Sequence, residues 1–442
     1  MNDASRGQDR CGGGRGWPPI VWVALGAATL SAVPASAAPA DPVAVTDDGL
    51  YAKVDEAWRA SWDRFYDERT NLFYDRVCSL DAAEPLGCLP TPDECARQYP
   101  NPNGWGTGME DCAISGGVML SMICDRFAAT GEGELRAAAK KAFAGMVLLG
   151  AASPSKGFVI RGVTPADGHS HYSESSRDQY TWYAYGLWRY YRSPLSTDEE
   201  KAAMREIMAA ICARLERNVV AEHDYHIGRE DGTFDGLVDK MWENEAHEIA
   251  RLPMIYAIGA ELTGDERWRA AAKRFAPEAA AQSAGESTKI LYALLQEQVS
   301  LEALYELEDS PELKARWLEC MRLVARRAEA GCRNGLAYRP LDAAGIDLDW
   351  RAWPLRESRG YQIPTLPDIC KEEDRTIRQP AEAILVQFFL PDPALTPEQV
   401  AVVKQAIAQV DYAKIVTYGL YYTQAAYWRG VRLGVVRLPD NR

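Results

Sequence analysis

Two aspartates stand where apolar, charge-poor segments begin, and paired carboxylates can carry out acid/base chemistry. Asp111 follows the glycine-rich run 103–110, and Asp178 follows residues 172–177. Glycosidic cleavage needs such a pair, because one carboxyl group protonates the leaving oxygen while the other activates water or attacks the sugar. The alternative is structural, since aspartate is a favoured helix N-cap. Their positions predict that Asp111 and Asp178 are the catalytic pair, with Asp178 as the general acid/base.

One member of such a pair must hold a proton. A helix N-terminus favours the ionised form of a carboxyl group, so the acid must be desolvated or lie near a like charge. Glu110, Glu174, Glu243 and Glu245 are close enough in sequence to supply that charge. We therefore expect acidic neighbours around whichever aspartate serves as the proton donor.

Polar and aromatic side chains gather on the same segments. All five histidines fall between residues 169 and 247, although a single histidine is more often a structural hydrogen-bonding group than a catalyst. Flat aromatic rings can stack on sugars, while core packing explains Trp182 equally well. The expected substrate-binding residues are Trp105, Glu110, His169, His171, Tyr172, Arg177, Trp182, His226, Trp242, Glu243 and Trp353.

These residues need a scaffold that brings them together, and the spacing of apolar residues and breakers predicts one made of helices. The predicted helices cover residues 51–67, 111–129, 134–150, 178–192, 197–219, 242–262, 265–280, 288–308, 311–330, 379–390, 396–410 and 415–430. The links that follow the even-numbered helices are short and rich in turn residues. The return links are mostly long, at 68–110, 151–177, 220–241 and 331–378.

Alternate helices also differ in composition. The segments 114–123 and 180–188 carry almost no charge and several small residues, whereas 134–143 and 198–207 combine charge with an apolar stripe. Six helical hairpins closed into a ring, with the even-numbered helices inside, would place the long loops on one face. The prediction is an all-α (α/α)6 toroid with one functional mouth, and the alternatives are an open solenoid or an irregular helical domain.

The first residues are expected to direct export. Three arginines precede the apolar stretch 20–33, and small residues at 35–37 offer a cleavage site, as in a secretory signal peptide. We therefore predict a signal peptide at 1–37, a flexible leader at 38–50 and a catalytic domain at 51–442. The protein is expected to be periplasmic or secreted.

Export would allow the cysteines to form disulfides. Cys78, Cys88 and Cys95 lie on the first long loop, and Cys332 and Cys370 lie on the last one, so either set could restrain a long segment. Cysteines on predicted helices are expected to be buried thiols. Since no Cys-x-x-Cys or His-x-x-x-His spacing supports zinc, the sequence predicts neither a metal nor a cofactor.

The overall charge limits the possible partners. A formal net charge of −14 argues against nucleic acid and anionic membranes. The apolar stretch near the N-terminus is too short for a firm membrane anchor. An anionic sugar remains compatible with the charge, because a local group of arginines can bind carboxylates. The arginines that could do so are Arg161, Arg177, Arg351, Arg356 and Arg359.

Four runs in the first half of the chain form a recognisable series. They are Glu110 to Ile114, Phe127 to Gly131, Gly157 to Arg161, and Arg177 to Gln179 ahead of Tyr180 to Gly186. The series resembles the six-hairpin glycosidases, most closely the unsaturated uronyl hydrolases and related glucuronidases. The resemblance implies an (α/α)6 toroid with two catalytic aspartates at the starts of inner helices. Asp111 and Asp178 match them here, the second through Trp182 and Gly186.

The favoured function is therefore an exported glycoside hydrolase that acts on uronate-containing oligosaccharides or polysaccharides. A polysaccharide lyase on the same fold is the first alternative, with Tyr172, His171 or His226 as the base and Asn244 beside the uronate carboxylate. The second alternative is a sugar-binding protein without turnover.

Overall fold

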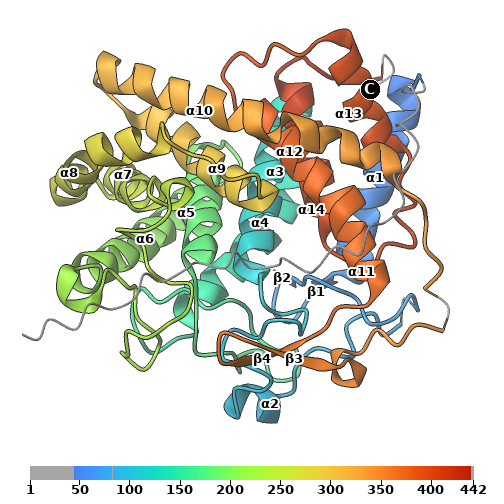
Figure 1. Cartoon of the computed structure of the whole chain (residues 1–442), viewed down its shortest axis with the longest axis horizontal. Coiled ribbons are helices and arrows are strands. Elements are labelled where there is room, and N and C mark those ends of the chain that lie inside the picture. Colours follow the sequence, from blue (N-terminus) through green and yellow to red (C-terminus); the bar gives the residue numbers. More distant parts are fainter. Residues whose placement is uncertain (1–43, 82, 344, 440–442) are drawn as a thin grey trace, which may run out of the picture. The chain divides into compact units, whose positions relative to one another are not determined.

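The computed structural model describes residues 44–81, 83–343 and 345–439, and this part of the chain is mainly helical (Figure 1). The predicted signal peptide at 1–37 lies outside the described residues, as do residues 38–43 of the predicted leader.

The inner helices form a closed ring. They are α3 (Cys112–Thr130), α5 (Arg177–Arg192), α7 (Arg251–Thr263), α9 (Leu291–Leu307), α12 (Gln379–Phe388) and α14 (Gly419–Arg432). In sequence order each inner helix packs on the next, and α14 packs on α3. Because the first and last inner helices touch, the ring is closed and the predicted (α/α)6 toroid is confirmed.

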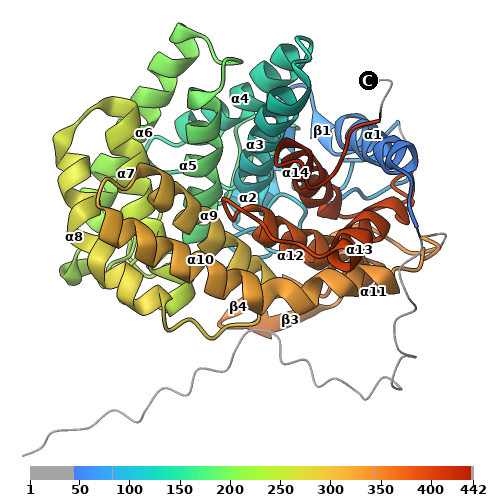
Figure 2. The same cartoon turned by 90° about the horizontal axis from the view of Figure 1, so that it is seen from above.

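A second set of helices surrounds the ring, as Figure 2 shows. These outer helices are α1 (Asp47–Arg64), α4 (Leu135–Ala151), α6 (Asp198–Asn218), α8 (Glu266–Ser283), α10 (Pro311–Cys332) and α13 (Pro397–Ala408). Helix α1 begins four residues earlier than predicted, because the Thr46 hydroxyl caps it by accepting a hydrogen bond from the Gly49 amide at 3.1 Å. Residues 47–50 therefore belong to the helix rather than to a leader.

Three inner helices start three or more residues later than the sequence predicts. The predicted helix 242–262 begins only at Arg251, and a loop with a short 3-10 helix (Ala246–Glu248) precedes it. Pro253 explains this start, because a residue without an amide hydrogen fits the first turn of a helix and disrupts its interior. Helices α9 and α14 likewise begin three and four residues after their predicted starts.

The last return link contains more helix than expected. Helix α11 (Asp368–Glu373) and a π-helical turn (Asp374–Arg378) run directly into α12, so part of the predicted loop 331–378 is helical. The Glu373 carboxylate fixes this segment by accepting hydrogen bonds from the backbone amides of Val416 and Thr417. The remaining short 3-10 helices are Ala221–His223, Arg333–Ala337 and Trp350–Ala352.

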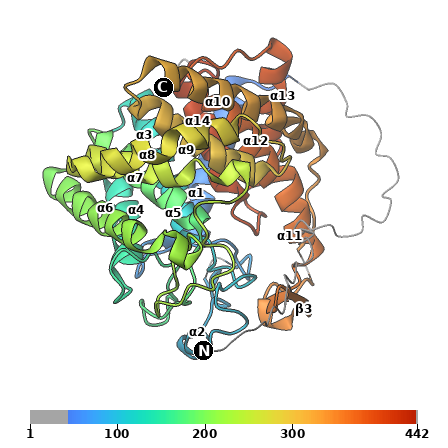
Figure 3. The same ribbon diagram turned by 60° about the vertical axis from the view of Figure 1, so that its left-hand side comes forward.

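Short strands and loops lie together at one end of the helices (Figures 1 and 3). Strand β1 (Tyr66–Asp67) pairs with β2 (Leu72–Phe73), and β3 (Leu355–Ser358) pairs with β4 (Tyr361–Pro364), both antiparallel. Helix α2 (Pro92–Ala96) belongs to the same region. Strand β1 corrects the predicted helix 51–67, because α1 ends at Arg64 and residues 66–67 pair with β2. The first and last return links supply the other elements, so long loops cover one end of the ring as predicted.

Small residues let two inner helices approach closely. A methyl group on Gly117 of α3 would lie 2.2 Å from the Trp182 carbonyl oxygen of α5, and one on Gly186 would lie 2.6 Å from the Gly117 Cα. Helix α3 is apolar and long enough to cross a membrane, yet 83% of its window is buried in the protein. The small residues and missing charge of this helix therefore reflect its place in the core.

Candidate active site

Inner helices begin at the loop-covered end and bring charged and aromatic side chains together there. The side chains are Asp111 before α3, Asp178 in α5, Arg251 in α7, Tyr292 in α9, Arg378 before α12 and Tyr418 before α14. Asp111 interacts electrostatically with Asp178 and with Arg378, which come from two other helices. Residues far apart in the sequence therefore share one site.

Asp111 is held by side chains from other parts of the chain. Its Oδ1 accepts a hydrogen bond from Gln179 Nε2 at 2.8 Å and lies 3.5 Å from Arg161 Nη1. Its Oδ2 accepts a hydrogen bond from the Tyr418 hydroxyl at 3.3 Å. Among the described residues, the Asp111 side chain makes no capping bond to α3, and it is 23% exposed. A helix-capping role therefore does not account for this carboxylate.

The surroundings favour the protonated form of Asp111. Burial raises the pKa of the Asp111 carboxyl above its ordinary value, and the charge of Arg161 opposes this shift. Repulsion from Glu110 raises the pKa further, Arg378 lowers it, and the nearby Asp178 raises it again. The net effect is upward, which suits a proton donor.

Asp75 supports the start of α3 and was not identified from the sequence. This fully buried carboxyl accepts a hydrogen bond from the Asp111 amide at 2.8 Å. Burial, followed by repulsion from Asp111 and Glu110, raises the pKa of Asp75 well above its usual range. The sequence did hold one signal for Asp75, which is its position directly after the apolar run 72–74. An acid next to a buried segment is expected to be buried too, and a buried acid needs a specific partner.

Asp178 has the opposite character. Ser176 caps helix α5, so Asp178 in the first turn is free of that role. The Asp178 carboxylate accepts a hydrogen bond from Arg251, whose side chain is fully buried, while Asp178 itself is 27% exposed. Burial acts to raise the pKa of Asp178, but the charges of Arg251 and Arg177 outweigh it and lower the pKa. Asp178 is therefore ionised at neutral pH.

Arg177 connects the ion pair of Asp178 and Arg251 to the loop before α7. Its Nη2 donates a hydrogen bond to Glu248 Oε1 at 2.8 Å, and Glu248 also lies 3.9 Å from Arg251. Burial lowers the pKa of Arg177 to about 10, so the group remains charged at neutral pH. The side chain of Arg177 is 18% exposed, which leaves part of it open to a ligand.

Arg378 and Tyr418 complete the environment of Asp111. Arg378 donates a hydrogen bond to the Tyr418 hydroxyl, and this hydroxyl donates to Asp111. Burial raises the pKa of the half-buried Tyr418 well above its ordinary value, so the phenol stays neutral and can donate. Neither residue was expected from the sequence, because no local motif marks them and Tyr418 lies 307 positions from Asp111.

Two of the expected binding residues lie beside this group. Trp105 is half-buried, and its ring centroid lies 6.0 Å from that of Tyr361 and 5.9 Å from the Arg161 guanidinium. Glu110 accepts hydrogen bonds from the amides of Gly106 and Gly108, at 3.1 and 2.7 Å. Glu110 thus shapes the glycine-rich loop and supplies negative charge near Asp111.

Three expected sugar-binding aromatics lie in the interior. The Tyr172 hydroxyl donates to the Tyr99 carbonyl oxygen at 2.7 Å, and the residue is only 1% exposed. Trp182 is 1% exposed, and Trp242 packs on Phe275 of α8 with ring centroids 4.6 Å apart. These contacts give Tyr172, Trp182 and Trp242 packing roles. Large aromatic side chains are the residues for which packing and ligand contact are hardest to separate by sequence.

Trp353 and the loop before α7 have local contacts. The indole nitrogen of the buried Trp353 donates to the Asp347 carbonyl oxygen at 2.8 Å, and its ring lies 5.6 Å from the Arg76 guanidinium. Glu243 is exposed in a left-handed backbone conformation with φ of 51°, and Asn244 donates to the Lys240 carbonyl oxygen at 3.0 Å.

The histidines proposed for the mouth are held by other groups. His169 is 76% exposed and bonded within its own turn. His171 Nε2 pairs with Glu230 Oε1 at 2.9 Å, and His226 Nδ1 pairs with Asp239 Oδ1 at 2.6 Å. Within residues 44–439 as described, no group of three His, Cys, Asp or Glu side chains is arranged to hold a metal ion.

A buried ionic network lies near the opposite ends of the inner helices. Arg189 of α5 donates to Asp125 of α3 at 2.7 Å, and the Tyr185 hydroxyl donates to Glu302 of α9. Arg429 of α14 pairs with the same glutamate. The opposite charges compensate one another. The contacts join α3, α5, α9 and α14, so the network links four inner helices.

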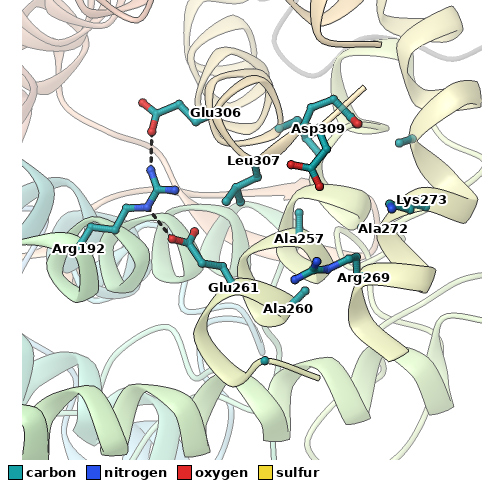
Figure 4. Close-up of a pocket in the computed structure, with 14 residues that line it drawn as sticks. Arg192, Ala257, Ala260, Glu261, Arg269, Ala272, Lys273, Glu306, Leu307 and Asp309 are labelled. Atoms are coloured by element: carbon teal, nitrogen blue, oxygen red, sulfur yellow. Dashed lines mark hydrogen bonds and ion pairs between the residues drawn. The ribbon is translucent and has the colours of Figure 1, made fainter. Parts of the chain in front are cut away.

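A hollow of about 390 Å³ also lies at that end, between α7, α8 and α9 (Figure 4). Arg192 spans part of it, with ion pairs of 2.7 Å to Glu261 and 2.6 Å to Glu306. Asp111 and Asp178 are not among its lining residues, so the hollow is separate from the candidate active site.

Comparison with known protein families and with curated proteins gives no match. Two solved structures are similar in fold. One is cellobiose 2-epimerase from Spirochaeta thermophila DSM 6192, which is 14% identical, with a TM-score of 0.47 over 88% of this chain and 98% of that chain. The other is a sugar epimerase from a ruminal bacterium, which is 12% identical, with a TM-score of 0.45 over 86% of this chain and 98% of that chain.

Proposed function

We propose that this chain is a glycoside hydrolase that cleaves uronate-containing oligosaccharides, with Asp111 as the proton donor and Asp178 as the ionised base or nucleophile. One observation carries the proposal. Two partly exposed carboxylates face one site from the starts of two inner helices, neither caps its helix, and their pKa values are shifted in opposite directions. General acid/base cleavage of a glycosidic bond requires such a pair, in which one carboxyl group holds a proton and the other is ionised.

The assignment of roles differs from the expectation drawn from sequence. Sequence position favoured Asp178 as the acid/base, but its bond to Arg251 stabilises the carboxylate form. Asp111 is the member whose pKa is raised, so we assign proton donation to it. Asp178 would then activate the attacking water or attack the sugar carbon directly.

The proposed preference for uronates rests on the arginines of the site. Arg161 and Arg378 act on Asp111, and Arg177 and Arg251 act on Asp178. The side chains of Arg177 and Arg378 are 18% and 17% exposed, so each can present part of its guanidinium to a substrate carboxylate. Local positive charge of this kind would attract an anionic sugar to an acidic protein.

Aromatic side chains at the mouth would bind the sugar rings. Trp105 is half-buried beside Arg161, and Tyr292 at the start of α9 is 38% exposed and interacts electrostatically with Asp178. Each presents a flat surface near the proposed catalytic carboxylates, which suits stacking on a sugar ring.

The contacts of the candidate lyase bases favour hydrolysis over elimination. A lyase needs a base that reaches the proton beside the uronate carboxylate. Tyr172 is buried with its hydroxyl bonded to the Tyr99 carbonyl, and His171 and His226 are each paired with a carboxylate. Asp111 and Asp178 are better placed for chemistry at the mouth.

The direct test is incubation of the purified protein with uronate-containing polysaccharides and with their lyase digests, followed by mass spectrometry. Hydrolysis adds one water for each bond cleaved, which is the expected result. A product with a new ultraviolet-absorbing double bond would indicate a lyase instead. A product of unchanged mass and altered stereochemistry would indicate an epimerase. Binding without any product would support a sugar-binding protein, and each of these three outcomes overturns the proposal.

A matched control separates turnover from a contaminating activity. Asp111→Asn and Asp178→Asn should abolish product formation, whereas Asp93→Asn should not. Asp93 lies in α2, is 77% exposed and forms an ion pair of 2.9 Å with the exposed Arg97. Activity that survives in both site variants would come from another protein or another site.

A further inference from the structure

Two cysteines of the first return loop lie in contact with each other. The Cys88 amide donates a hydrogen bond to Cys78 Sγ at 2.9 Å, and each thiol shifts the pKa of the other. The Cys78 amide donates to the Pro85 carbonyl oxygen at 2.8 Å, so the chain folds back between the two residues. The Cys78 sulfur is therefore held against the backbone of Cys88.

The third cysteine of this loop is in a different position. Cys95 lies in α2 and is 1% exposed. Burial raises the pKa of its thiol to about 12, and Asp167 and Glu94 are the charged groups that act on it. Cys95 is thus a buried thiol without a cysteine acting on it in the described part of the chain, and it provides a matched control for Cys78 and Cys88.

The other pair considered from sequence is not brought together. Cys332 ends α10, and Glu329 is the charged neighbour that acts on its thiol. The thiol of Cys370 in α11 is influenced by Arg76 and Glu373, and within the described part of the chain neither thiol acts on the other. The contact between thiols is therefore a property of Cys78 and Cys88.

We infer that Cys78 and Cys88 form a redox modification site, at which a disulfide of the glutathione type oxidises the two thiols to an intramolecular disulfide. A disulfide requires its two residues to lie close together with their side chains facing each other. The 2.9 Å contact between the Cys88 amide and Cys78 Sγ already holds the two residues close together.

The two thiols have different roles in the reaction. The hydrogen bond from Cys88 lowers the pKa of the half-buried Cys78 thiol, whereas its bond to Cys78 and burial raise the pKa of Cys88. The Cys78 thiolate attacks oxidised glutathione, forming a mixed disulfide and releasing one glutathione thiolate. Cys88 then loses its proton, attacks the Cys78 sulfur and releases the second glutathione. The protein loses two electrons and two protons, which reduce the glutathione disulfide.

The cross-link would form where two return loops meet. The Cys88 carbonyl oxygen accepts hydrogen bonds from Trp350 Nε1 at 2.9 Å and from Arg351 Nη1 at 3.0 Å. Arg351 also pairs with Glu94 of α2. A disulfide between Cys78 and Cys88 would therefore fix the segment on which the last return loop rests.

The test uses the reduced full chain, which is treated with oxidised glutathione, alkylated and mapped by peptide mass spectrometry without reduction. The wild type should yield linked peptides that contain Cys78 and Cys88 and together weigh two hydrogens less than the free peptides. Cys88→Ser should keep glutathione on Cys78, because the resolving thiol is missing. Cys78→Ser should give neither product, and Cys95→Ser should behave as the wild type.

Thermal unfolding provides a second readout. Closing a loop of about ten residues with a disulfide should raise the Tm of the oxidised wild type and Cys95→Ser by roughly 2–4 °C. Oxidised Cys78→Ser and Cys88→Ser should show no such increase. Recovery of both Cys78 and Cys88 as alkylated thiols in the oxidant-treated wild type overturns the inference, as does a disulfide that involves Cys95. The wild-type peptide map gives this answer even if a variant fails to fold.

Discussion

Arg251 and Asp178 join the starts of two inner helices through an ion pair in which the guanidinium is fully buried and the carboxylate is 27% exposed. The arrangement holds Asp178 as an anion that is still partly exposed, because the buried positive charge of Arg251 stabilises an ionised carboxylate beside it. Asp111 has no arginine bond of comparable strength, since Arg161 Nη1 is 3.5 Å away. In the proposed mechanism, this difference makes Asp178 the base and Asp111 the acid.

Substituting either aspartate should stop catalysis. We expect Asp111→Asn and Asp178→Asn each to lower kcat by a factor on the order of a hundred or more, the usual scale for losing a positioned acid or base. The measurement is steady-state kinetics on whichever oligosaccharide the wild type hydrolyses. Normal kcat in either folded variant would remove that residue from the mechanism.

The same two variants should differ in stability. Asp111→Asn can keep the hydrogen bond from Gln179, whereas Asp178→Asn removes the carboxylate bonded to the buried Arg251 and leaves it only Glu248, 3.9 Å away. We expect Asp178→Asn to lower the free energy of unfolding by roughly 1–3 kcal/mol and Asp111→Asn to have a smaller effect. Denaturant unfolding curves measure this difference, and equal stabilities would show that Arg251 has another adequate partner.

Tyr418 should tune the pKa of Asp111. Its hydroxyl donates to Asp111 Oδ2, which stabilises the ionised carboxylate, so Tyr418→Phe should raise the pKa of Asp111 further. Activity that requires protonated Asp111 is lost as pH rises through that pKa, and the basic limb of the kcat profile should therefore move to higher pH. Tyr183→Phe is the control, because the Tyr183 hydroxyl bonds the Met146 carbonyl oxygen instead. An unchanged basic limb in Tyr418→Phe would contradict this role.

The close approach of α3 and α5 should make Gly117 intolerant of a side chain. In Gly117→Ala, the added methyl would lie 2.2 Å from the Trp182 carbonyl oxygen, so the helices must separate. We expect a loss of about 1–3 kcal/mol in the free energy of unfolding, the usual cost of overpacking a core. Gly133→Ala is the control, because in the described structure nothing lies within 4 Å of the added methyl. Equal unfolding midpoints for the two variants would contradict the packing argument.

The toroid could be predicted because its signals are local and repeated. Apolar spacing, charge-poor inner segments and alternating link lengths all pointed to a ring of hairpins, and the contact between α3 and α14 closes it. Helix starts were less predictable. Pro253 and the loop before it set the start of α7, whereas the apolar pattern alone suggested a longer helix.

The candidate site was only partly predictable, because its contacts join distant parts of the chain. Asp111 and Asp178 stood out by position, but capping propensity gave each a competing structural role. Gln179, Tyr418 and Arg161 satisfy the Asp111 carboxylate in place of the helix amides, and no local pattern reports such contacts. Tyr172 shows the converse, since a loop position suggested ligand contact while tertiary packing buried the ring.

A buried glutamate near Arg378 should make stability depend on pH. Burial raises the pKa of Glu382 to about 7, and the charge of Arg378, 3.7 Å away, only partly opposes this shift. The folded state therefore binds a proton more tightly than the unfolded chain does. This contribution is fully present below the ordinary glutamate pKa of about 4.3 and is lost as pH rises through about 7. Glu382→Gln should flatten the dependence of Tm on pH in that window and raise Tm relative to wild type at pH values above it. If the two proteins show parallel curves of Tm against pH, Glu382 is not the group that titrates.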